Sequence, residues 1–216
     1  MDKKFFLLGA GGHASVLADI LRQNKLIISG LFSPEIDFAR AALSGIPIFK
    51  NEDEIFEYQC NTVSIINGVG SLPGSNLRTK LFNKFTEQGY SFQQVISKHS
   101  FISDFATLGQ GVQVMPRAII QAGAVIGDNT IINTGAIIEH DCIIGKHNHV
   151  APGVTLSGQV STGNNVHIGS GATVIQGISI GDGAVIAAGA IITKHVESGK
   201  MVFGARSHIQ DKKGKS

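Results

Sequence analysis

The second half of the chain repeats an aliphatic residue at every sixth position. The series begins at Ile102 and ends at Ile192, and fifteen of its sixteen members are Ile, Leu or Val, with Thr162 as the exception. Four positions after each member comes a second residue that is mostly small or β-branched, such as Ala118 or Ala124. An α-helix does not explain this period, because its 3.6 residues per turn would spread these positions around the helix.

Six-residue repeats predict a parallel β-solenoid with three flat walls, since each repeat supplies one short strand and one corner. Three repeats close a coil, and successive coils stack at the strand spacing of about 4.8 Å. The aliphatic side chains point inward, where burial contributes about 1.5–3 kcal/mol each. Corners need positive φ or tight bends, which Gly, Asn and Asp supply. A further series of glycines recurs every 18 residues, at Gly109, Gly127, Gly145, Gly163 and Gly181. An unbroken series of this length argues against an ordinary β-sandwich.

The first half of the chain predicts a small α/β unit of the Rossmann type. An apolar run over 3–8 ends in a glycine-rich loop containing Gly9, Gly11, Gly12 and His13, and a helical pattern follows through Leu21. A strand, a glycine turn and a helix form the setting of a phosphate-binding loop, because the backbone can approach the ligand and the helix offers free N–H groups. The alternative is a glycine turn that only packs the helix on the strand.

Further elements complete this unit. Residues 26–32 and 62–67 read as strands and residues 52–58 and 76–88 as helices, which gives a sheet of three or four strands and a linker near residues 97–99. We therefore expect two domains, residues 1–97 and residues 98–216. About 95 residues hold only half of a dinucleotide-binding domain, so a mononucleotide-sized ligand fits the first domain better.

Composition narrows the class of protein. Apolar residues make up 43% of the chain, charged residues 16%, and the net charge is +2. These values exclude a disordered chain, and they disfavour a nucleic-acid partner. Two cysteines, Cys60 and Cys142, cannot form a disulfide framework, so we expect a reducing compartment and hence the cytoplasm. No run approaches the roughly 18 apolar residues that cross a bilayer, so no membrane partner is expected.

Histidines are the candidate general acid–base groups, because an ordinary imidazole titrates near neutral pH. His140 stands between Glu139 and Asp141 at a predicted corner, where it should point outward. A neighbouring carboxylate can fix the tautomer of the ring and raise its basicity. The plainer alternative for His140 is a solvated loop residue. His149 and His167 are 18 residues apart and should stack on one wall.

Other residues carry no catalytic role in this interpretation. His147 and His195 are expected to be solvated corner residues, and Cys142 occupies an inward position of the repeat. Cys142 is therefore expected to be a core residue and not a nucleophile.

The glycine loop, the α/β unit and the hexads, in this order, resemble the sialic-acid O-acetyltransferase-like group of hexapeptide-repeat acyltransferases. That group includes N-acetyltransferases that act on nucleotide-linked 4-amino-4,6-dideoxy sugars. The resemblance implies a Rossmann-like α/β subdomain followed by a left-handed parallel β-helix, assembled as a homotrimer. It also implies acetyl-CoA as co-substrate in the cleft between subunits, a nucleotide-linked amino sugar as acceptor, and no metal.

The resemblance also assigns roles to individual residues. His140 would be the general base, Asp141 would orient it, and Asn133 would lie close to it. His149 would lie near the acetyl group and the acceptor sugar. The residues that would bind the nucleotide sugar are Gly9, Gly11, Gly12, His13 and Ser33. Ser33 stands where the family often has an Asp, which leaves the identity of the nucleotide base open. Besides His149, the residues that would contact CoA are Gly171, Gly189, Lys194 and Arg206.

Three other functions are compatible with these residues. The same site could acetylate a hydroxyl of sialic acid or a related sugar. A zinc site between subunits could use His149 and His167, although no third histidine has a matching position. The chain could also be a non-catalytic trimeric scaffold that binds a sugar, in which case loss of the imidazole at position 140 would not matter.

Overall fold

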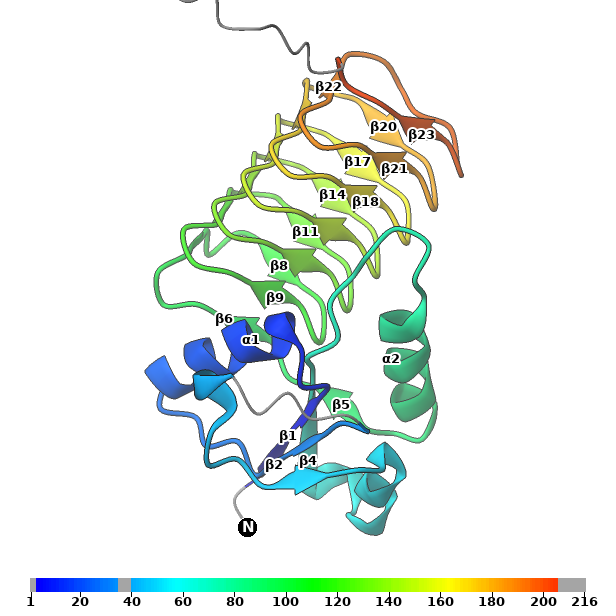
Figure 1. The fold of residues 1–216 in the computed structure, drawn as a ribbon. Helices are drawn as coiled ribbons and strands as arrows, with labels where there is room; N and C mark the ends of the chain where they lie inside the picture. Colours follow the sequence, from blue (N-terminus) through cyan, green and yellow to red (C-terminus); the bar gives the residue numbers. More distant parts are fainter. Residues whose placement is uncertain (1–2, 35–39, 206–216) are drawn as a thin grey trace, which may run out of the picture.

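The structure is a computed structural model that describes residues 3–34 and 40–205. Figure 1 shows an α/β unit at one end and a column of stacked coils that rises from it. The candidate CoA residue Arg206 lies outside the described residues.

The α/β unit contains a five-stranded parallel sheet with the strand order β3-β2-β1-β4-β5. Its strands are β1 (Lys4–Leu8), β2 (Gly30–Phe32), β3 (Ile48–Phe49), β4 (Val63–Asn67) and β5 (Ser91–Phe92). Its helices are α1 (Gly12–Gln23), α2 (Leu77–Glu87) and the short 3-10 helices η1 (Ala41–Leu43), η2 (Glu52–Glu57) and η3 (Cys60–Thr62). The expected count of three or four strands was too low, because β3 and β5 are only two residues long and carry no periodic signal.

The two faces of this sheet are covered by different elements. Leu17 and Leu21 of α1 pack with Leu7 and Ile66 of the sheet, and the same cluster continues into Met115 of the column. The other face packs against α2, through the aromatic side chains Phe82 and Phe85 among others. One continuous apolar cluster therefore joins the α/β unit to the base of the column.

The column is a parallel β-helix with three walls, as the six-residue period predicts, and it is left-handed, as the resemblance implies. Each strand is two residues long, and within the column a strand pairs with the strands 18 residues before and after it, as Ile131 pairs with Gln113 and His149. The first wall consists of β6 (Val95–Ile96), β9 (Gln113–Val114), β12 (Ile131–Ile132), β15 (His149–Val150), β18 (His167–Ile168), β21 (Val185–Ile186) and β23 (Met201–Val202). The second wall consists of β7 (Phe101–Ile102), β10 (Ile119–Ile120), β13 (Ile137–Ile138), β16 (Thr155–Leu156), β19 (Thr173–Val174) and β22 (Ile191–Ile192). The third wall consists of β8 (Thr107–Leu108), β11 (Val125–Ile126), β14 (Ile143–Ile144), β17 (Ser161–Thr162) and β20 (Ser179–Ile180).

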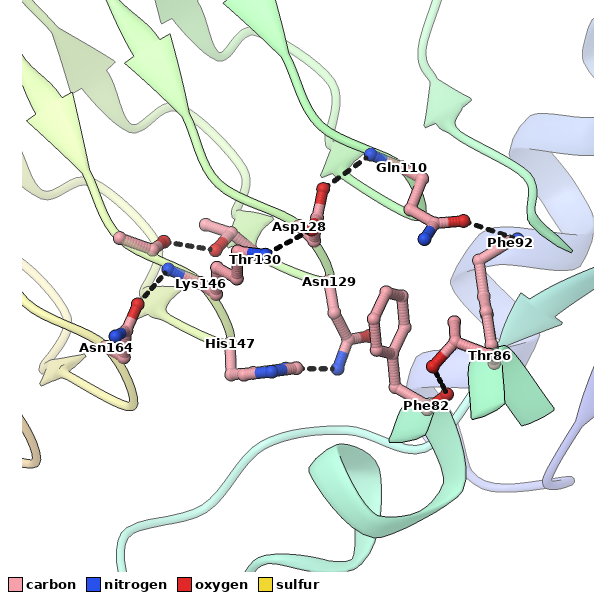
Figure 2. Close-up of polar contacts among 11 residues, drawn as sticks. Phe82, Thr86, Phe92, Gln110, Asp128, Asn129, Thr130, Lys146, His147 and Asn164 are labelled. Carbon is pink, nitrogen blue, oxygen red and sulfur yellow. Dashed lines mark hydrogen bonds and ion pairs between the residues drawn. The ribbon is translucent and has the colours of Figure 1, made fainter. Parts of the chain in front are cut away.

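Three rows of corners connect these walls. The first corner joins the first wall to the second, the second corner joins the second wall to the third, and the third corner leads into the next coil. The period-18 glycines lie at the third corner, where neighbouring coils approach closely: a Cβ on Gly145 would lie 2.2 Å from the carbonyl oxygen of Gly163. Side chains also link the coils there, since Asp128 Oδ1 accepts from the Gln110 N–H at 3.0 Å (Figure 2).

A polar cluster lies in the interior where three successive coils stack. Thr162, the exception in the aliphatic series, accepts a hydrogen bond from Asn148 Nδ2 at 2.6 Å. The Asn148 N–H donates to Thr130 Oγ1 at 3.1 Å, and Asn148 Oδ1 accepts from the Val166 N–H at 2.7 Å. Thr130, Asn148 and Thr162 are all buried, so these hydrogen bonds satisfy polar groups inside the column.

The expected linker near residues 97–99 is part of the first coil. The Ser97 N–H donates to Val114 O at 2.9 Å, and the Arg117 N–H donates to His99 O at 2.9 Å. Ser97 is buried, and β6 precedes it as the first strand of the column. We propose a domain boundary near residue 97. No helix within the described ranges is long and apolar enough to cross a membrane.

Candidate active site

The glycine loop lies at the carboxyl end of β1, which is flanked by β2 and β4 in the sheet. The strand order changes direction at β1, and crevices at such a point are where open α/β sheets bind ligands. Gly9 has φ +89°, which favours glycine, and its N–H donates to Phe32 O at 2.7 Å. Gly11 caps α1, whose first residue is Gly12, so the free N–H groups of the helix face this crevice.

His13, in the first turn of α1, points toward the first wall of the column. Its Nε2 lies 2.7 Å from Oε1 of Gln113, and Gln113 Nε2 donates to Asn67 O at 2.7 Å. Because the amide oxygen can only accept, His13 Nε2 carries the proton and donates. Burial, and after it the charge of Arg78, lowers the pKa of His13 to about 4. His13 is therefore neutral at pH 7.

His149, on the first wall, is held by two hydrogen bonds. Its Nδ1 donates to Ser71 O at 3.1 Å, and its Nε2 accepts from Asn133 Nδ2 at 3.1 Å. Its ring meets that of His167 edge-on, with 4.8 Å between centroids, as the spacing of 18 residues predicts. Burial, and after it the neighbouring His167, lowers the pKa of His149 to about 4.

His140 lies at the second corner and is half-exposed, with 52% of its side chain accessible. Its Nδ1 lies 2.9 Å from Asp141 Oδ2, so the carboxylate holds a proton on Nδ1. Asp141 has φ +60°, a left-handed conformation that Asp tolerates better than most residues. A Cβ on Gly158 would lie 2.5 Å from His140 Nε2, so the ring packs directly over this glycine.

These groups form two separate clusters within one chain. Asn133 and His149 lie at the first corner and first wall, on the same side as the glycine loop, whereas His140 and Asp141 lie at the second corner. Asn133 and His140 thus stand at opposite ends of the second wall. The amide of Asn133 contacts His149, whereas the family pattern led us to expect it beside His140.

The remaining candidate residues are placed as follows. Ser33 is buried directly after β2, and its N–H donates to Phe49 O at 2.9 Å. Gly171 and Gly189 each have φ +68° and lie at the first corner, in the coils above Asn133. Lys194 is exposed after β22.

Comparisons with known proteins match both parts of the chain. The PglD N-terminal domain model matches residues 4–85, the bacterial transferase hexapeptide model matches residues 123–158, and the model of the hexapeptide repeat of succinyl-transferase matches residues 159–194. A comparison with curated proteins gave no match.

Solved structures match nearly the whole chain. PerB from Caulobacter crescentus, in complex with CoA and GDP-perosamine, is 30% identical, with 96% of this chain and 97% of that chain covered and a TM-score of 0.82. The chain belongs to the hexapeptide-repeat sugar acetyltransferases. The acetyltransferase domain of PglB from Neisseria gonorrhoeae FA1090, in complex with acetyl coenzyme A, is 28% identical, with 94% and 97% covered and a TM-score of 0.83. WeeI from Acinetobacter baumannii AYE is 24% identical, with 94% and 97% covered and a TM-score of 0.81, and shares the fold.

Membership of this acetyltransferase family confirms the predicted fold class and the prediction of an enzyme over that of a scaffold. Perosamine N-acetyltransferase from C. crescentus was also solved as variants with one histidine replaced by asparagine or alanine, in complex with CoA and GDP-perosamine. The part of this chain that the structure describes holds no cluster of three or more His, Cys, Asp or Glu side chains suited to a metal ion.

The prediction for His147 was wrong. His147 is not a solvated corner residue: its Nδ1 accepts from Asn129 Nδ2 at 3.0 Å, and its ring meets Phe82 of α2 edge-on at 5.4 Å (Figure 2). Burial lowers its pKa below the ordinary value. The sequence pattern places His147 at a corner but says nothing of the helix that covers this corner.

Two polar residues near the crevice escaped the sequence analysis altogether. Gln113 is fully buried beneath His13, although outward positions of the walls are usually exposed. Arg78 is 4% exposed, on the face of α2 that meets the column. The available signals were weak: Gln113 shares its position on the wall with apolar Ile131 and with His149, and Arg78 lies in the first turn of an amphipathic helix.

Proposed function

We propose that this protein transfers the acetyl group of acetyl-CoA to the 4-amino group of a nucleotide-linked 4-amino-4,6-dideoxy sugar. The observation that carries the proposal is the half-exposed pair of His140 and Asp141 on the column of a chain that also bears a glycine loop at a strand-order crevice. The match to PerB in complex with CoA and GDP-perosamine supports an amino sugar as acceptor.

His140 would act as the general base. Asp141 keeps the proton on Nδ1, so Nε2 carries the lone pair that accepts the proton of the sugar amine. The amine nitrogen attacks the thioester carbonyl carbon, the C–S bond breaks, and the leaving CoA thiolate takes the proton that His140 received from the amine. Asp141 would stabilise the imidazolium that forms. No acyl-enzyme is needed, and buried Cys142, whose pKa is raised mainly by burial, is not suited to be a nucleophile.

The complete site would require a second copy of the chain. His13, Asn133 and His149 face the crevice side of the column, and His140 lies at another corner, so one chain supplies only half of the constellation. A homotrimer would bring the second corner of one column to the first corner of the next. Exposed apolar side chains near the second corner and third wall support such an interface: Phe105 is 81% exposed and Ile143 59%.

Acetyl-CoA would run along the first corner toward the C-terminal end of the column. Gly171 and Gly189 at this corner leave room for a ligand, because no atom lies within 4 Å of a Cβ added to either. Lys194 and Arg206 are the candidate partners for the CoA phosphates. Two free cysteines are compatible with a cytoplasmic location, which is part of this proposal.

The nucleotide would bind at the glycine loop, with the diphosphate at the N-terminus of α1. His13, as a neutral donor and acceptor, would lie on the path from this loop to His149. Ser33 lies at the end of β2, where the nucleotide base would be recognised.

The test is a screen for release of the CoA thiol from acetyl-CoA. The acceptors are UDP-, GDP- and dTDP-linked 4-amino-4,6-dideoxy sugars, with free sialic acid as the comparison. We expect turnover with at least one nucleotide-linked amino sugar and none with sialic acid. Turnover with sialic acid alone would replace N-acetylation by O-acetylation, and no turnover with any acceptor would overturn the proposal.

A further inference from the structure

Arg78, in the first turn of α2, is a buried cation with an unusual set of partners. Its side chain is 4% exposed, and its Nη1 donates to Asn67 O and to Val69 O, both at 2.8 Å. Its Nε donates to Asn129 O at 3.2 Å, whereas Nη2 is buried and has no hydrogen-bond partner. Among the residues that the structure describes, no carboxylate forms an ion pair with Arg78.

The three carbonyl groups that Arg78 binds belong to two parts of the molecule. Asn67 ends β4 and Val69 follows it, whereas Asn129 lies at the third corner of the column. The Asn67 side chain adds to this connection, because its Nδ2 donates to Arg78 O at 3.0 Å and to Asn129 Oδ1 at 3.2 Å. Arg78 thus fastens the segment after β4 to the column.

That segment, residues 67–71, forms the second side of the crevice that faces the glycine loop. A Cβ on Gly9 would lie 3.3 Å from Val69 Cγ2, and a Cβ on Gly70 would lie 3.5 Å from His13 Cβ. Ser71 accepts the hydrogen bond from His149 Nδ1. The segment therefore touches the glycine loop at one end and the candidate sugar site at the other.

The positive charge of Arg78 also acts on the histidines that line the same crevice. This charge is the second cause, after burial, of the lowered pKa of His13, and the last of the causes that act on the pKa of His149. A buried charge without an opposite charge is unfavourable, because it has lost its hydration without gaining an ionic partner. The diphosphate of a nucleotide sugar bound at the glycine loop would bring negative charge to this crevice.

We propose that Arg78 is a positioning residue for the nucleotide sugar: its fork of donors holds residues 67–71 against the glycine loop, and its buried charge complements the substrate diphosphate. The proposal rests on the proposed function only in that the ligand of the crevice is a nucleotide sugar. Arg78 has no exposed donor, so it acts through the segment it holds and through its field.

Three variants test this role. Arg78→Lys keeps the charge but replaces the planar guanidinium, whose Nε and Nη1 donate in different directions, with a single ammonium nitrogen. Arg78→Met removes both the charge and the donors. Arg22→Met is the matched control, since Arg22 is an exposed arginine on α1 that donates to Ser44 O. We expect the KM for the nucleotide sugar to rise about 10-fold in Arg78→Lys and more in Arg78→Met, with the KM for acetyl-CoA unchanged, because the crevice loses its shape and its charge. Equal KM values for the sugar in Arg78→Lys and in the control would overturn the proposal.

A binding measurement separates this proposal from the proposed function. The probes are UDP, GDP, dTDP and inorganic pyrophosphate, and the readout is the rise in Tm that each produces in each variant. We expect the diphosphate that stabilises the wild-type protein to stabilise Arg78→Lys less and Arg78→Met least, while Arg22→Met behaves as wild type. This result would support the role of Arg78 even if no acetyl transfer were found, and equal stabilisation of all variants would overturn it even if transfer occurred.

A titration of His13 by NMR, in variants shown to be folded, reports directly on the charge of Arg78. In folded Arg78→Met the titration midpoint of His13 should move up toward its ordinary value, whereas Arg78→Lys and Arg22→Met should leave it low. An unchanged midpoint in Arg78→Met would show that the charge does not act on the crevice. If Arg78→Met does not fold, the KM and Tm results for Arg78→Lys decide the question.

Discussion

At the scale of single residues, the two candidate histidines of the column differ in what their nitrogens can do. Both nitrogens of His149 are engaged, one with Ser71 O and one with the Asn133 amide, so His149 is suited to hold a group in place. His140 uses only Nδ1 in its bond to Asp141, which leaves Nε2 for proton transfer. The geometry therefore separates a base from a positioning group.

Replacement of His140 should abolish most turnover. We expect His140→Gln to lower kcat by roughly 10²–10⁴-fold, the usual contribution of a positioned general base, with little change in Tm because the side chain is half-exposed. The control is His195→Gln, which removes an exposed histidine whose Nδ1 accepts only from the Ser179 N–H. Steady-state kinetics with the preferred acceptor measures the effect, and a His140→Gln enzyme as active as the control would contradict the assignment.

His13 and His149 should make the protein sensitive to acid. Each folded-state pKa is lowered from 6.5 to about 4, mainly by burial, with Arg78 of α2 near both rings and His167 of β18 against His149. Between pH 6.5 and 4 the unfolded chain binds more protons than the folded one, so stability falls as the pH falls through this window. The loss is on the order of 1–3 kcal/mol for each histidine.

Denaturant unfolding at pH 7 and pH 5 measures this effect. We expect His13→Gln to lose less stability than the wild type between these two pH values, since glutamine does not titrate. A pH dependence equal to that of the wild type would show that His13 is not the buried group responsible.

At the scale of elements, the corners of the column use glycine for two physical reasons. At Gly177 the backbone has φ +73°, but a Cβ there would meet nothing within 4 Å. At Gly145 a Cβ would lie 2.2 Å from the carbonyl oxygen of Gly163, so the next coil leaves no room for a side chain. Glycine is thus required at position 177 by the backbone conformation, and at position 145 by the close approach of the neighbouring backbone.

Alanine substitutions distinguish the two reasons. Gly177→Ala should cost about 1–2 kcal/mol, the penalty of a left-handed conformation for a residue with a Cβ. Gly145→Ala should cost clearly more, because two coils must move apart and their hydrogen bonds with them. Thermal unfolding of the two variants gives the comparison, and equal changes in Tm would contradict this account.

The sequence predicts elements well where their signal is local. The hexads give the walls, the inward residues and the corner residues such as Asn129 and Asn165, because each repeat imposes its own strand and turn. Strands β3 and β5 were missed because two residues carry no period. The contacts of Arg78 with Asn129 and of His147 with Phe82 join residues 51 and 65 positions apart, and no local pattern specifies such pairs. The sequence thus offers candidate residues for the site, but it indicates neither their division into two clusters nor the buried Gln113 and Arg78 beside them.

At the scale of the whole molecule, the separation of Asn133 from His140 within one chain allows a direct test of whether the active site is made from two subunits. A mixture of His140→Ala and Asn133→Ala subunits can form sites in which an intact His140 from one chain meets an intact Asn133 from another. Random assembly should restore roughly a quarter of the wild-type sites. We therefore expect co-expressed subunits to recover activity that neither variant has alone.

The control for this experiment is a mixture of His140→Ala and Asp141→Ala subunits. Both residues belong to the same corner of the same chain, so no arrangement of subunits restores an intact pair. Recovery in the control, or none in the first mixture, would contradict a site made from two copies. Light scattering of the same samples reports whether they are trimers.

The polar cluster of Thr130, Asn148 and Thr162 has a consequence for how successive coils pair in the correct register. Aliphatic coils are interchangeable, so a turn that pairs with the wrong neighbour would bury almost the same surface as the right one. A slip of one turn would place the Asn148 amide against hydrocarbon, leaving polar atoms unsatisfied at about 1–3 kcal/mol each. The polar cluster therefore specifies which coils pair with one another. Correct pairing in turn sets the positions of His140, His149 and the crevice along the column.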